Sequence, residues 1–212
     1  MSLVELIAQA DERGLAASGL ACLDRCVPLL GGDDEILRPL WASLADPDSA
    51  PGDWGERLEQ ARGKLGADGD SGDGSDSGDG SGGGDEGGDR DGDGEGGRGG
   101  EAALLARRML AATPADFRAA EVRVWADACS VASLQIHRLL DPAEDASSLD
   151  SRREGRTEGM PPLVAAELRR QITVLELLAG HGVGGLRRAL EVSTQGRRVL
   201  RAVVSRRARG RA

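Results

Sequence analysis

Apolar residues recur every three or four positions along most of this 212-residue chain, and no segment alternates apolar and polar residues as a half-buried strand would. The chain opens with Ser2 and Glu5 at the spacing of a capping box, which marks the start of a helix. A glycine, Gly14, is expected to end that helix. In this first part the pattern predicts four short helices, at about 3–13, 16–27, 36–44 and 54–65.

Four further helices are predicted in the second part of the chain. Thr113 and Pro114 are expected to end one helix and to cap the next, the longest. The apolar face of that helix is expected to hold Phe117, Val124, Trp125, Ala128, Ala132, Ile136 and Leu139. Gly180 is expected to end the third of these helices. The four ranges are about 104–112, 115–140, 162–179 and 186–208. The fold class that follows is all-α, a helical bundle of about eight helices.

A stretch rich in glycine and aspartate separates these two groups of helices. Residues 66–100 hold 17 of the 32 glycines, no apolar side chain larger than Ala, and a net charge of −9 from nine Asp, two Glu and two Arg. Such a composition lacks the apolar surface needed for a core, so we expect a disordered acidic linker. The domains expected are an N-terminal helical segment 1–65, the linker 66–100, and a C-terminal bundle 101–209 with a mobile loop at 141–160 and a tail at 210–212.

The four N-terminal helices are short, and their apolar surface is modest for an independent core. The linker holds them near the C-terminal helices at an effective concentration of about a millimolar. We therefore favour docking of the two parts on each other over two separate units, although the sequence is compatible with both.

Two groups of residues resemble metal ligands, but neither completes a site. Asp89, Asp91 and Asp93 match the start of an EF-hand calcium loop, yet position twelve is Gly100 where a bidentate glutamate belongs. Cys22 and Cys26 lie one helical turn apart without a CxxC motif or further donors at zinc-site spacing. We expect buried thiols, no metal and no cofactor.

Catalytic residues are not recognisable in the sequence. His137 and His181 have no neighbouring serine, cysteine or paired carboxylate that suggests a triad. The glycine-rich turn at 179–185 follows a predicted helix and lacks the lysine and hydroxyl of a phosphate-binding loop. The expectation is a protein that is not an enzyme.

Charge is concentrated at the C-terminus, where residues 186–212 hold nine Arg and one Glu, a net charge of +8. A clustered charge marks a contact surface better than the net charge of the chain does. We expect a non-enzymatic protein-interaction or regulatory protein; the alternative is a nucleic-acid-binding protein. Under that alternative, phosphates are contacted by seven arginines of the last helix: Arg187, Arg188, Arg197, Arg198, Arg201, Arg206 and Arg207. The acidic linker is a third possible partner of this basic helix.

The expected location is the cytoplasm. The N-terminus MSLVELIAQADERG lacks the basic and apolar regions of a signal peptide, and no apolar run approaches the ~18–20 residues of a membrane span. Three cysteines suit reduced thiols better than a disulfide framework. One Lys among 27 basic residues, with abundant Ala, Gly and Asp, is typical of a high-GC bacterium.

Overall fold

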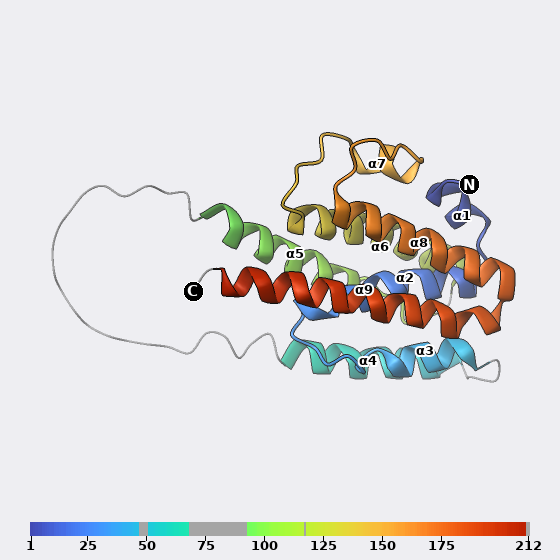
Figure 1. Cartoon of the computed structure of the whole chain (residues 1–212). Coiled ribbons are helices and arrows are strands. Elements are labelled where there is room, and N and C mark those ends of the chain that lie inside the picture. The colour runs from blue at the N-terminus through green and yellow to red at the C-terminus, as the bar shows by residue number, and fades with distance from the viewer. Residues whose placement is uncertain (47–50, 68–92, 117, 211–212) are drawn as a thin grey trace, which may run out of the picture.

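Helices form the fold throughout the part of the chain that the computed structural model describes, which is residues 1–46, 51–67, 93–116 and 118–210 (Figure 1). No strand occurs in these ranges, which confirms the all-α prediction. The elements are α1 (Leu3–Gln9), α2 (Glu12–Cys26), the 3-10 helix η1 (Val27–Leu29), α3 (Arg38–Ala45), α4 (Pro51–Ala67), α5 (Asp93–Ala111), α6 (Ala119–Leu140), α7 (Leu149–Arg153), α8 (Pro162–His181) and α9 (Val183–Arg209).

The first two helices meet at Ala10 and Asp11. The predicted capping box is present, because the Ser2 amide donates to Glu5 at 2.8 Å and the Glu5 amide donates to the Ser2 hydroxyl at 3.3 Å. Gly14 was predicted to end the first helix, but it lies in the first turn of α2. Its amide donates to the Asp11 carboxylate at 2.6 Å. A capping aspartate, and not the glycine, therefore sets the boundary.

Helix α2 is the centre of the fold. Every residue from Gly14 to Cys26 is buried, so this helix has no solvent-facing side. It packs against α6, α8, α9 and α3, which surround it (Figure 1). One hydrophobic cluster contains residues of both parts of the chain, from Leu3 to Leu200. The N-terminal helices thus dock into the C-terminal bundle, and the two parts share a single core.

Helices α8 and α9 form the long hairpin at the front of the bundle (Figure 1). α8 does not end at Gly180 as predicted but continues through His181, and it is capped by Gly182, whose φ is +51°. α9, and not α6, is the longest helix in the described ranges, with 27 residues. It packs against α2, α3 and η1 as well as α8, so one side of α9 belongs to the core.

The predicted linker is shorter than 66–100 at both ends. α4 extends through Ala67, and α5 begins at Asp93. Once an apolar stripe has nucleated a helix, each added residue contributes one hydrogen bond, so a helix can extend past its last apolar position. The rest of the predicted linker, 68–92, lies outside the described residues. Of the calcium-like string, Asp89 and Asp91 lie there too, and Asp93 opens α5.

The connection between α5 and α6 differs from the prediction. Thr113 does not cap α6, which starts at Ala119; its hydroxyl instead donates to the Met109 carbonyl of α5 at 3.2 Å. Contacts from α4 fix this connection, because the Trp54 indole donates to the Pro114 carbonyl at 2.8 Å and the Arg62 guanidinium to the Thr113 carbonyl at 2.8 Å. α6 therefore begins at Ala119, about one helical turn after the predicted start at residue 115.

Residues 141–160, which the sequence predicts as a mobile loop, contain α7 and a set of fixed polar contacts. Arg152 is 2% exposed and pairs with Asp145 at 2.6 Å. The same guanidinium donates to the carbonyls of Arg156 and Glu158 at 2.9 and 2.7 Å. The Asp141 carboxylate accepts from the Leu163 amide at 2.7 Å, in the first turn of α8. Asp141, Asp145 and Arg152 are therefore bonded within the protein, whereas the side chains of most other polar residues in this segment are exposed.

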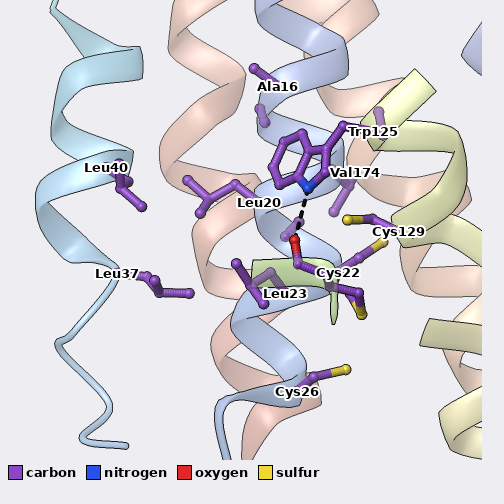
Figure 2. Packing of buried hydrophobic residues seen from close by; sticks show 14 of the residues in the cluster. Ala16, Leu20, Cys22, Leu23, Cys26, Leu37, Leu40, Trp125, Cys129 and Val174 are labelled. Atoms are coloured by element: carbon purple, nitrogen blue, oxygen red, sulfur yellow. Dashed lines mark hydrogen bonds between the residues drawn. The ribbon is translucent and has the colours of Figure 1, made fainter. Parts of the chain in front are cut away.

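The inner face of α6 was predicted correctly only in part: Trp125 and Ile136 are buried as predicted, and Phe117 lies outside the described residues. Val124 is 71% exposed and Ala128 is also exposed, whereas Trp125 and Cys129 face the core. The Trp125 ring packs beside α2, and its indole nitrogen donates to the Met109 carbonyl at 3.0 Å (Figure 2). The exposed positions were assigned inward because polar residues occupy several of the buried positions of this helix.

The contact between α2 and Trp125 provides a test of the packing. A Cβ atom on Gly19 would lie 2.5 Å from the Trp125 ring, so Gly19→Ala is expected to lower the free energy of unfolding by about 1–3 kcal/mol through overpacking. In the control, Gly63→Ala on α4, the new methyl meets nothing within 4 Å, so stability is expected to rise by about 0.5–1 kcal/mol. Urea denaturation measures both; equal effects would contradict the close approach.

Candidate functional site

One side of α9 carries a row of exposed arginines, which we call the arginine face. It consists of exposed guanidinium groups on the side of the helix that points away from α2: Arg187, Arg188, Arg198, Arg201, Arg206 and Arg209. The 3.6-residue period puts these positions on one side of the helix and Leu186, Ala189 and Leu200 on the other. Glu191 is the one carboxylate among the exposed α9 positions in the described range.

The seven arginines singled out from the sequence fall into three groups. Arg188, Arg198 and Arg206 are exposed and form no ion pair with any residue in the described ranges. Arg187 and Arg201 are exposed and lie near carboxylates, 3.6 Å from Glu191 and 2.5 Å from Asp34 respectively. Arg207 is half-buried, and Arg197 is buried. Arg209, which the sequence interpretation did not include, joins the exposed group.

Arg197 has a different role from the predicted phosphate contact. It is 4% exposed, pairs with Asp24 of α2 at 2.6 Å, and lies 3.2 Å from Asp34. Burial raises the pKa of Asp24 to about 6, while the charges of Arg197 and Arg25 act in the opposite direction. Arg197 therefore holds α9 to the N-terminal part of the chain and is not available to a partner.

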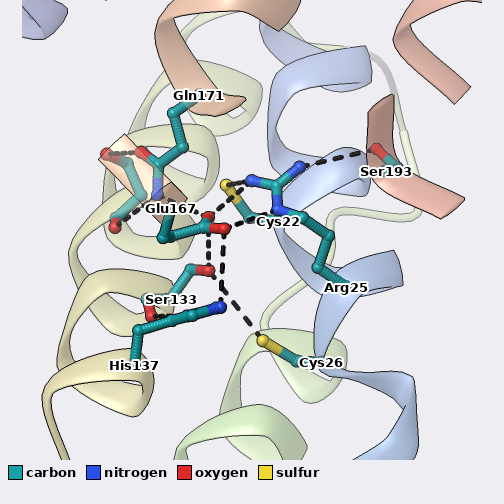
Figure 3. Close-up of polar contacts among 9 residues, drawn as sticks. Cys22, Arg25, Cys26, Ser133, His137, Glu167, Gln171 and Ser193 are labelled. Carbon is teal, nitrogen blue, oxygen red and sulfur yellow. Dashed lines mark hydrogen bonds and ion pairs between the residues drawn. The ribbon is translucent and has the colours of Figure 1, made fainter. Parts of the chain in front are cut away.

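Further along α2, a buried ion pair joins it to α8. The Arg25 guanidinium donates to both carboxylate oxygens of Glu167, at 2.8 Å from Nε and 2.6 Å from Nη2 (Figure 3). Both side chains are 0% exposed. Such a two-bonded pair is the strongest geometry available to an arginine and a carboxylate. A buried pair is retained only where the remaining polar atoms also find partners.

The neighbours of this pair supply those partners, and we call the whole group the polar centre: Arg25, Ser133, His137, Glu167, Gln171 and Ser193. The Ser133 hydroxyl and the Gln171 amide donate to Glu167 at 2.7 and 2.9 Å. Arg25 also lies 3.4 Å from the Ser193 hydroxyl of α9. Side chains of α2, α6 and α8 therefore meet at the Glu167 carboxylate, and α9 joins this group through the Arg25 guanidinium (Figure 3).

His137 belongs to the polar centre, but only one of its two ring nitrogens has a hydrogen-bond partner. Its Nδ1 donates to the Ser133 carbonyl at 2.7 Å, while its Nε2 makes no hydrogen bond and lies 3.6 Å from a Glu167 oxygen. Burial lowers the pKa of His137 despite the nearby Glu167 charge. The neutral imidazole is therefore favoured over the charged one at this buried position.

Glu167 remains ionised in this setting. Burial alone would raise the pKa of its carboxyl, but the charges of Arg25 and His137 and the hydrogen bonds outweigh burial and lower that pKa to about 2. Because the folded-state pKa is depressed, the contribution of Glu167 to stability is present above the ordinary pKa of 4.5 and is lost as the pH falls toward 2.

Sequence interpretation missed the polar centre, although a signal for it exists. On α8, Glu167 and Gln171 follow Val164 at i+3 and i+7, so they belong to the same helical face as the buried Leu168 and Leu175. On α9, Ser193 follows Ala189 at i+4 on the buried face. Polar residues at apolar-face positions on several helices indicate a buried network. Which of them pair with one another depends on contacts 142 residues apart in sequence.

The three cysteines are free and buried, as expected for the first two. Burial raises the pKa of the Cys22 thiol to about 12, with the Arg25 charge opposing it, so this thiol is protonated at neutral pH. Within the described ranges, no three or more His, Cys, Asp or Glu side chains gather closely enough to hold a metal ion. The Cys22 sulfur instead lies 3.4 Å from the Arg25 guanidinium.

Comparison with known proteins gives no family to guide the interpretation. No protein-family model matches the chain, and neither a curated protein nor a solved structure matches it significantly. In the described ranges, no helix combines the length and the apolar character needed to cross a membrane.

Removing one partner of the buried pair tests its role. Arg25→Met is expected to lower the free energy of unfolding by about 3–5 kcal/mol, because Glu167 is left charged and buried without its cation. Replacing Glu167 by Met as well is expected to recover part of that loss. The control, Arg38→Met, breaks an exposed pair with Glu35 and is expected to cost less than about 1 kcal/mol. A loss as small for Arg25 as for Arg38 would be inconsistent with a central role for the pair.

The buried imidazole predicts a specific pH dependence. Because the folded-state pKa of His137 lies below its ordinary 6.5, the unfolded chain takes up a proton more readily, and stability is lost as the pH falls below 6.5. His137→Gln is expected to make this slope shallower by at most about 1.4 kcal/mol per pH unit between pH 5 and 6.5. His181 is exposed at the end of α8, so His181→Gln serves as the control and should keep the wild-type slope. Urea unfolding at several pH values compares the three proteins.

Proposed function

We propose that this protein is a non-enzymatic interaction or regulatory protein that docks an anionic partner on the arginine face of α9. The observation that carries the proposal is the row of six exposed arginines on one side of a single helix, with Glu191 as the one acidic residue among them. Arg187 and Arg201 lie near the carboxylates of Glu191 and Asp34, and the other four arginines form no ion pair within the described ranges. An excess of one charge along a rigid element attracts a partner of the opposite sign and raises its association rate.

The other side of α9 supports this role by fixing the helix. Leu186, Ala189 and Leu200 are almost fully buried, and Arg197 is paired with Asp24 of α2. A contact surface built on a helix held in this way needs little ordering when its partner binds, so less of the binding free energy is lost.

The setting of the histidines supports a non-catalytic protein. His137 and its neighbour Glu167 are 1% and 0% exposed, and Gln171 and Ser133 are buried with them. A substrate cannot contact these groups unless the core opens. Their mutual hydrogen bonds account for them as structural residues.

The docking surface is tested with exposed variants, because deleting the last 27 residues would also remove Leu200 and Arg197 from the core. Replacing Arg198 and Arg206 with Gln is expected to lower the salt concentration at which the full chain elutes from immobilised heparin, a polyanion that does not favour one class of partner. The matched control carries Arg107→Gln and Arg108→Gln on α5, which are also exposed and change the net charge equally.

The control is expected to elute as the wild type does. Equal shifts for both double variants would mean that net charge and not the arginine face governs binding, and would contradict the proposal. Thermal unfolding of each variant checks that the fold is retained.

A further inference from the structure

We infer that the partner of the arginine face is duplex nucleic acid, bound through its backbone phosphates and without reading its sequence. The inference rests on the proposed function and specifies its partner. It follows from four properties of the face: its length, the absence of an available apolar surface, the position of the aromatic side chains, and the helices that flank α9.

The length of the face matches a repeat of the duplex. Arg187 and Arg209 are 22 positions apart in one helix, which at 1.5 Å per residue is a separation of about 33 Å. One turn of B-form DNA is about 34 Å long. Arg187 and Arg209 lie at the two ends of this length of helix, and Arg198 lies halfway between them. A straight row of this kind can contact phosphates over one whole turn.

A membrane surface fits the face poorly. A helix that lies on a bilayer inserts an apolar side among the lipid chains. The apolar side of α9 is occupied by the protein core, with Leu186 at 3%, Ala189 at 0% and Leu200 at 0% exposure. Lipid headgroups could pair with the arginines, but α9 has no free apolar side to insert among the acyl chains.

A folded protein partner also fits poorly. The energetic centre of a protein interface is built on Trp, Tyr and Arg side chains that pack into desolvated pockets of the partner. α9 supplies arginines for such a centre, but its sequence contains no aromatic residue to anchor it. Between the exposed arginines of α9, Val199 is 37% exposed and Ala202 is small. A surface whose exposed charges are almost all guanidinium groups instead suits a ligand that presents a row of phosphates.

Single-stranded nucleic acid would require stacking platforms. Proteins that bind single strands place successive bases on exposed aromatic rings. The three tryptophans of the chain, Trp41, Trp54 and Trp125, are 4%, 3% and 3% exposed, and Tyr is absent from the sequence. The backbone of a duplex needs no such platform.

The flanking helices exclude entry of α9 into the major groove. A recognition helix must project from its domain, because the groove is about 12 Å wide and a helix with its side chains has a similar diameter. α9 packs against α3 on one side and α8 on the other, so only its outer surface is available (Figure 1). Arginines presented this way contact the phosphates at the groove edges rather than the bases within, which predicts binding without sequence preference.

The test is a salt titration of the full chain with a fluorescently labelled 20-base-pair duplex, followed by anisotropy. With about five phosphate contacts, a plot of the logarithm of the binding constant against the logarithm of salt concentration is expected to have a slope of about −4 to −5. Replacing Arg198 and Arg206 with Gln is expected to make the slope shallower by about 2, one unit for each lost contact. The Arg107→Gln, Arg108→Gln control is expected to keep the wild-type slope. Two unrelated duplex sequences should give the same constants.

Three competitors separate the partner classes: the single strand of the same length, polyglutamate, and vesicles containing anionic lipid. The duplex is expected to bind most tightly. Stronger binding to any competitor, or an unchanged slope in the arginine variant, would overturn the inference. If heparin retention still depends on Arg198 and Arg206 in that case, the arginine face remains a docking surface for another anion. If heparin retention does not depend on them, the proposed function fails as well.

Discussion

The buried pair of Arg25 and Glu167 is the interaction on which the rest of the fold depends. Removing two charges from water costs several kcal/mol per ion, so the pair is tolerable only when each polar atom has a partner. Ser133 and Gln171 provide hydrogen bonds to the carboxylate, and Ser193 lies beside the guanidinium. These requirements fix α6, α8 and α9 around α2. The first 65 residues are therefore part of the core and not an appended unit.

The same pair explains a glycine that looks unfavourable in the sequence. Gly196 interrupts α9 with a poor helix former. A Cβ atom at this position would lie 2.4 Å from Cδ of Arg25 and 3.0 Å from Cδ of Arg170. The aliphatic part of the Arg25 side chain packs against α9 at this point. A glycine is needed here for α2 and α9 to approach closely, although it has a low helix propensity.

Helix periodicity was sufficient to predict the helical class and the approximate position of most elements, because apolar residues recur at helical spacing in each of them. Helix periodicity was insufficient to identify every residue that faces the core. On α6, Ser130, Ser133 and His137 occupy buried positions, so the exposed Val124 was assigned inward. Arg197 on α9 was assigned outward for the same reason. The partners of these buried polar groups lie beyond the reach of local pattern analysis: Gln171 is 41 residues from Ser130, Glu167 is 34 residues from Ser133, and Asp24 is 173 residues from Arg197.

Arginine has two distinct roles in this chain: some arginines are bonded within the fold, and others are exposed on the arginine face. Arg62, Arg123 and Arg152 donate to backbone carbonyls at or beyond the ends of helices, which leave such groups without intrahelical partners. Those arginines, together with Arg25 and Arg197, are used within the fold. The exposed arginines of α9 are placed so that like charges three positions apart, such as Arg198 and Arg201 or Arg206 and Arg209, repel one another. That repulsion weakens the helix, and burial of the opposite side of α9 offsets it. The fold therefore sustains an excess of positive charge on one rigid surface, which Glu191 and Asp34 offset only at Arg187 and Arg201.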